Sequence, residues 1–180
     1  MTKKLIQLFI ESSERFLESE RSLILSGVSE RCLCGAFMLI LRQVIDQSIF
    51  SAYFTDIEYN RNFDGKIKTM INDNMEVTNI TCDLIVHSRG TIPELDNLIA
   101  IEMKRDDHHD TEKDKDRIRL RALTKPKNDS QTYSAEGEVF PENVCGYKIG
   151  VFYEISITKR QVNIEYYLNG LFSGKYLKDF

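Results

Sequence analysis

The stretch "LIAIEMKR", residues 98–105, decides the fold that we predict for this chain. Its first four residues form an apolar run, which is typical of a buried strand. Successive side chains of a strand point to opposite faces, so Glu102 and Lys104 share one face. The opposite face takes Ile99, Ile101 and Met103. An acid beside an amine at the end of a buried strand is either a solvated pair or part of a functional site.

A second strand is expected at 79–87, "NITCDLIVH", where Asp83 interrupts an otherwise apolar run. An aspartate inside such a run costs free energy unless it has partners. If the two strands pair as an antiparallel hairpin, Asp83 and Glu102 face one another near the open strand ends. Two carboxylates with a lysine beside them would form an oxygen-ligand site for Mg²⁺. Like charges brought so close repel without a cation, which also favours a metal.

The other segments alternate between helical and strand patterns, and they predict an α/β protein. The expected elements are helices at 3–19 and 30–47, the latter capped by Ser29, a strand at 51–61, a polar excursion at 66–79, a helix from 111, and strands at 147–157 and 161–170. The order is therefore helix, helix, strand, strand, strand, helix, strand, strand. We predict a single domain over 1–180, with an N-terminal helical extension at 1–28 and a core at 29–168. The core is a mixed β-sheet flanked by helices.

Composition narrows the class of protein. A formal charge of −4 over 180 residues argues against non-specific coating of nucleic acid, but it leaves room for local basic patches. The N-terminus lacks a signal-peptide pattern and no apolar run could span a membrane, so we expect a cytoplasmic protein with no membrane partner. Four cysteines fit a reducing compartment. Cys32 and Cys34 diverge around a helix and no Cys-x-x-Cys pair occurs, so zinc is not expected.

The two strands carry a resemblance to a known superfamily. "CDLIVHSRG" (82–90) and "NLIAIEMKR" (97–105) resemble the Asp-(x)n-Glu-x-Lys signature of the PD-(D/E)XK nucleases, which have the restriction-endonuclease-like fold. The helix–strand–strand–strand–helix–strand order of that fold is similar to the order expected here from 30 to 157. With "VSERCLCGAFMLIL" (28–41) and "IEYNRN" (57–62), the chain looks like a group of small single-domain bacterial members. Cys82 stands where the superfamily often has a proline.

The resemblance implies roles for individual residues. Asp83 and Glu102 would be metal ligands, Lys104 the catalytic lysine, and Glu30 an accessory acid from the first core helix. The main-chain carbonyl of Met103 would be an extra ligand, because the strand brings it between the two flanking side chains. The implied activity is phosphodiester hydrolysis with Mg²⁺, or Mn²⁺ in its place, and DNA is the expected substrate. Accessory roles beside the site are considered for Glu58, Asn60 and His87.

The stretch "RIRLRALTKPK", residues 117–127, contains no acid. It is either a solvated helix face or a set of contacts to the phosphate backbone, which would add affinity and salt dependence. The residues concerned are Arg117, Arg119, Arg121, Lys125 and Lys127. Two alternatives to a nuclease remain: a catalytically silent domain that binds a protein or nucleic acid, and a small-molecule hydrolase, which would leave this stretch unexplained. The lack of a sequence-reading module suggests a homodimer or a partner subunit.

Overall fold

The computed structural model describes residues 1–59, 69–71, 77–79, 81–126 and 145–180. The helices are α1 (Thr2–Ser19), α2 (Arg21–Leu25), α3 (Glu30–Asp46) and α4 (Asp110–Thr124), with a 3-10 turn η1 (Pro93–Leu95). The strands are β1 (Phe54–Ile57), β2 (Thr69–Ile71), β3 (Val77–Asn79), β4 (Leu84–His87), β5 (Asn97–Arg105), β6 (Ile149–Ser156), β7 (Gln161–Leu168) and β8 (Leu171–Asp179). None of the helices in these ranges is long and apolar enough to cross a membrane.

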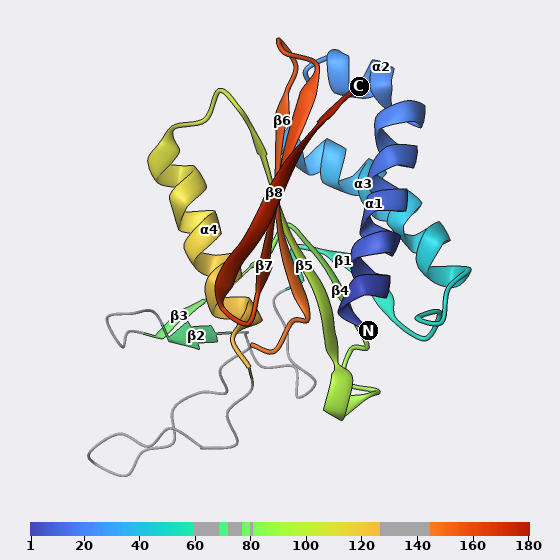
Figure 1. Ribbon diagram of the computed structural model, residues 1–180, viewed down its shortest axis with the longest axis vertical. Coiled ribbons are helices and arrows are strands. Elements are labelled where there is room, and N and C mark those ends of the chain that lie inside the picture. Colours follow the sequence, from blue (N-terminus) through green and yellow to red (C-terminus); the bar gives the residue numbers. More distant parts are fainter. Residues whose placement is uncertain (60–68, 72–76, 80, 127–144) are drawn as a thin grey trace.

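The protein has three layers, with one sheet between two layers of helices (Figure 1). Helix α4 covers one face of the sheet, and α1 and α3 cover the other. The sheet has six strands in the order β1-β4-β5-β6-β7-β8, and β2 and β3 form a separate hairpin. Neighbouring strands are antiparallel except β5 and β6, which are parallel and are joined through α4. The predicted mixed α/β architecture is therefore confirmed.

Strand β5 alternates between the two faces as its sequence predicts. Ile101 and Met103 are buried in the core beneath α1 and α3, whereas Ala100 belongs to a smaller cluster beneath α4. Strand β4 pairs with β5 in antiparallel register, and Leu84 lies opposite Ile101. Asp83 and Glu102 therefore lie next to each other on the two strands, just beyond the last backbone pair of the hairpin.

Helix α1 belongs to the same core as the sheet. The Phe9 ring centroid lies 5.7 Å from that of Phe37 in α3 and 6.0 Å from that of Tyr153 in β6. The Tyr153 hydroxyl in turn lies 2.9 Å from the Ser13 hydroxyl, which satisfies two buried polar groups. Residues 1–28, which were predicted to form an extension outside the core, thus contribute side chains to the core itself.

Several boundaries differ from those predicted. The strand expected at 51–61 covers only Phe54–Ile57, and the strand expected at 79–87 begins at Leu84. A short helix, α2, separates α1 from α3, and the sheet continues past residue 168 into the unpredicted strand β8. Helix α3 begins where predicted, because the Ser29 hydroxyl accepts a hydrogen bond from the Cys32 amide at 3.3 Å.

Helix α4 lies close to the sheet because β6 has a glycine beneath it. A Cβ atom added at Gly150 would lie 3.0 Å from Thr124 Cγ2 and 3.4 Å from Leu120 Cβ. Both of these residues belong to the buried face of α4. The close approach lets polar side chains one or two turns earlier on α4 reach the end of β5.

Candidate functional site

Asp83 and Glu102 lie at the end of the β4–β5 hairpin. Oδ2 of Asp83 accepts a hydrogen bond from the Met103 amide at 2.9 Å. The carboxylate thus takes the place of a main-chain acceptor just beyond the last β4–β5 backbone pair. The Glu102 side chain is only 1% exposed. Its Oε2 has no hydrogen-bond partner among the described residues. A buried carboxylate oxygen without a partner is costly, and either a proton or a bound cation would stabilise it.

Helix α4 supplies two charged residues that were not predicted to lie beside Glu102, namely Asp116 and Arg119. Nη1 of Arg119 lies 2.7 Å from Oε1 of Glu102 and 3.1 Å from Oδ1 of Asp116. Asp116 precedes Leu120 by four residues, on the buried face of α4. An acid that interrupts the apolar side of a helix is a signal readable in the sequence, and it would have found Asp116.

Lys104 and Glu30 complete the arrangement. Nζ of Lys104 lies 3.4 Å from Oδ2 of Asp116 and 3.6 Å from Oε2 of Glu30. The other oxygen of Glu30 accepts a hydrogen bond from the Arg105 amide at 2.8 Å and lies 3.1 Å from Nε2 of His108. The first turn of α3 is thereby fixed against the end of β5. The name Glu102 cluster is used below for six side chains: Glu30, Asp83, Glu102, Lys104, Asp116 and Arg119.

Within the described part of the chain, this cluster sets four carboxylates against two cations. Burial, and then the nearby Asp83 carboxylate, raise the pKa of Glu102 well above its ordinary value, although Arg119 opposes this. Burial also raises the pKa of Asp116 more than Lys104 and Arg119 lower it. In both groups the effect of burial exceeds that of the neighbouring cations, so a further cation beside them would stabilise their charged forms.

Lys104 is held in its charged form. Burial alone would lower its pKa, but the carboxylates of Asp116, Glu30 and Asp83 together raise it above the ordinary value. An ammonium that remains protonated cannot act as a general base at neutral pH. Its chemistry is therefore to attract anions and to donate hydrogen bonds.

These residues can hold only a metal ion that needs few protein ligands. No three His, Cys, Asp or Glu side chains in the described ranges are arranged to hold a metal ion. Mg²⁺ is usually held by one or two carboxylates, with water and substrate phosphate completing its coordination. Asp83 and Glu102 fit that requirement. The Met103 side chain instead enters the core, where its sulfur lies 3.8 Å from that of Cys34, so only its main chain faces Asp83.

The accessory residues lie in different places. The Glu58 carboxylate pairs with Arg31 at 2.6 Å, and the Glu58 amide donates to the Asp83 carbonyl at 3.2 Å. Glu58 has a φ of 49°, which is uncommon for a residue other than glycine and marks where β1 ends. His87 is buried, and its Nε2 lies 2.8 Å from Oδ2 of Asp56, on the β1 side of β4. Asn60 lies outside the described residues.

The basic stretch is largely engaged within the protein. Arg117 makes two hydrogen bonds of 3.0 Å to Glu165 of β7, and Arg119 pairs with Glu102. Arg121 is exposed, with its guanidinium 5.3 Å from the Tyr167 ring centroid, and Lys125 is also exposed. Lys127 lies outside the described residues.

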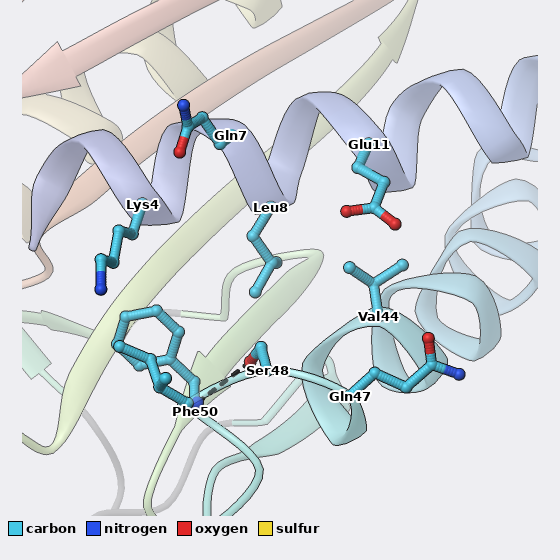
Figure 2. A pocket seen from close by; sticks show the side chains of 9 residues that line it. Lys4, Gln7, Leu8, Glu11, Val44, Gln47, Ser48 and Phe50 are labelled. Atoms are coloured by element: carbon cyan, nitrogen blue, oxygen red, sulfur yellow. Dashed lines mark hydrogen bonds between the residues drawn. The ribbon is translucent and has the colours of Figure 1, made fainter.

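A hollow of about 330 Å³ lies away from this cluster, between α1 and the end of α3 (Figure 2). Leu8 of α1 points toward Ser48 and Phe50, and Val44 of α3 also lines the hollow. Fourteen residues of helix separate Val44 from Glu30, a distance of about 21 Å along the axis. The hollow contains none of the residues predicted for the site.

Comparison with known proteins found no similar protein. The sequence matches no protein-family model, and neither curated proteins nor solved structures gave a match.

Proposed function

We propose that the protein is a Mg²⁺-dependent nuclease with a restriction-endonuclease-like fold, and that the Glu102 cluster is its active site. The observation that carries the proposal is the placement of Asp83 and Glu102 at the open end of one hairpin. Lys104 lies next to them on the same face of β5, and one buried oxygen of Glu102 has no partner among the described residues.

The order of elements supports the proposal. From α3 to β6 the chain forms a helix, three antiparallel strands, a helix and a strand parallel to the third. The small β2–β3 hairpin is inserted between the first two of these strands. This order is the one that the resemblance to the PD-(D/E)XK superfamily implies. Glu30 then stands in the first core helix, where the superfamily often has an acid.

The residues divide the chemistry between them. Asp83 and Glu102 would hold Mg²⁺ or Mn²⁺, with the main-chain carbonyl of Met103 as a further ligand. The bound metal supplies Lewis-acid activation of a phosphate and of water. Lys104, kept protonated by its acidic neighbours, stabilises negative charge on the phosphate undergoing attack. Glu30 positions Lys104 by binding its ammonium.

The proposed substrate is DNA. The exposed Arg121 of α4 and Lys125, the residue that caps its C-terminus, can contact its phosphates, which would make binding depend on salt. A second copy of the chain or another subunit would supply the remaining contacts.

A second candidate function is a catalytically silent domain that binds a protein or nucleic acid. It is favoured by the Arg119–Glu102 ion pair of 2.7 Å, which already gives the proposed metal ligand a cation. A permanent pair would leave the fold and the surface intact while preventing metal binding.

Cleavage of supercoiled, linear and single-stranded DNA separates these two functions. Wild type should cut with Mg²⁺ or Mn²⁺ and not with EDTA, and Lys104→Ala should lower the rate by about a hundredfold or more. Lys3→Ala removes an exposed lysine in the first turn of α1 and is the matched control, with wild-type activity expected. Folded wild-type protein that cuts none of the substrates would favour the silent domain. Cutting that survives Lys104→Ala would place the active site elsewhere.

A further inference from the structure

We infer that Arg119 is an internal substitute for the metal, and that a divalent cation must displace its guanidinium from Glu102 in order to bind. This inference rests on the proposed function, because it takes Glu102 as a metal ligand. The guanidinium nitrogen lies 2.7 Å from Oε1 of Glu102. Oε2 of the same carboxylate is the oxygen without a partner among the described residues, and a divalent ion bound there would lie beside the guanidinium on Oε1, so the two positive charges would repel.

Glu102 requires a cation whether or not a metal is present. Its side chain is 1% exposed, and a buried carboxylate without a counter-charge is strongly unfavourable. Arg119 meets that need from α4, and its own side chain is 28% exposed. The buried acid is thereby paired with a cation whose own side chain still reaches solvent.

Arg119 also has a second partner that it can keep when Glu102 is taken. The same Nη1 lies 3.1 Å from Oδ1 of Asp116, one helical turn away. The guanidinium can therefore leave Glu102 without losing all of its charge pairing, which keeps the exchange reversible. Arg117 differs, because it binds Glu165 through two hydrogen bonds and lies over the Phe152 ring at 4.5 Å.

Asp116 of α4 contacts both cations of the Glu102 cluster. Asp116 accepts from Arg119 through one oxygen and lies 3.4 Å from Lys104 through the other. Asp116 is a positioning residue: it retains Arg119 beside the site and holds the ammonium of Lys104. Without a metal Arg119 neutralises Glu102, and with a metal Asp116 would keep both cations nearby.

The first test is calorimetric titration of the metal-free protein with Mn²⁺. Arg119→Gln removes the competing cation, so it should bind Mn²⁺ about tenfold or more tightly than wild type. Lys115→Gln removes an exposed positive charge from the same helix and should bind as wild type does. Glu102→Gln should abolish binding. Unchanged or weaker binding by Arg119→Gln, with wild-type binding intact, would overturn the inference alone. No binding by any variant would overturn the proposed metal site as well.

The second test uses the wild-type protein, in case Arg119→Gln does not fold. The guanidinium NMR signals of Arg119 should be protected from solvent exchange without metal and should shift on saturation with Mg²⁺. The signals of Arg117 should stay in place and serve as an internal control. Arg119 signals that do not change at saturating Mg²⁺ would refute the displacement, even if Mg²⁺ binds.

Discussion

Gly150→Ala tests whether the glycine in β6 sets the distance between α4 and the sheet. The added Cβ would lie 3.0 Å from Thr124 Cγ2, 3.3 Å from Tyr167 Cβ and 3.4 Å from Leu120 Cβ. Two of these atoms are Cβ atoms, which cannot rotate away. Helix α4 or β7 must therefore shift by a few tenths of an ångström.

The cost follows from overpacking a closely packed interior. Inserting a methyl group without room costs about 1–3 kcal/mol. The smaller conformational freedom of alanine in the unfolded chain returns about 0.4–1 kcal/mol. The middle of each range gives an expected net loss of about 1.3 kcal/mol, which for a chain of this length lowers Tm by roughly 3–5 °C.

Gly35→Ala is the matched control, because no atom would lie within 4 Å of its new Cβ. Gly35 is inside α3, where alanine should stabilise the helix by about 1 kcal/mol. The same chemical change should thus have opposite signs at the two positions in urea unfolding followed by circular dichroism. Gly150→Ala protein as stable as wild type would refute the argument that α4 is held against this glycine.

Three further predictions concern buried polar groups. Arg117→Ala should lower the unfolding free energy in urea by about 2–3 kcal/mol, because it leaves the Glu165 carboxylate buried; a loss below about 0.5 kcal/mol would show a solvated pair. The raised pKa of Glu102 means that its contribution to stability is greatest below its ordinary pKa of 4.5 and is lost as the pH rises through the folded-state value. In the metal-free protein, the free energy of unfolding should therefore decline less steeply with rising pH in Glu102→Gln than in wild type. An equal slope in the two proteins would contradict this. Ser13→Ala should cost about 1 kcal/mol, and a double-mutant cycle with Tyr153→Phe should give coupling of the same size, with zero coupling contradicting the bond.

Local periodicity was enough to predict much of the fold. The alternation in β5 correctly separated Glu102 and Lys104 from the core-facing Met103, because side-chain direction in a strand depends only on position. Helix α3 was also predicted closely, since its apolar stripe and its Ser29 cap are both encoded within a few residues.

The partners across the sheet could not be predicted in the same way. Arg119 was expected either to lie on a solvated helix face or to contact phosphate, but its pairing with Glu102 depends on how the crossover helix lies on the sheet. That position depends in turn on Gly150, which lies 31 residues later in the sequence. The geometry of an ion pair between segments far apart in the sequence depends on how those segments pack. It cannot be predicted from the pattern of residues within either segment.

Strand β8 was missed for another reason. It is an edge strand, and the side chains of Leu171, Phe172 and Leu177 remain exposed. Its pairing with β7 consists of main-chain hydrogen bonds, which any sequence other than proline can make. A strand held in this way shows little of the burial pattern by which strands are recognised.

The aromatic core also determines when the chain can fold during synthesis. Phe9 meets Tyr153 and Tyr166, so these contacts join residues separated by more than 140 positions. The apolar side of α1 therefore leaves the ribosome shortly before α3, but long before its partners in β6 and β7 exist. Contacts of such high sequence separation slow folding and expose apolar surface in the meantime. We expect nascent chains that stop before β6 to bind chaperones through α1, and full-length chains to be released.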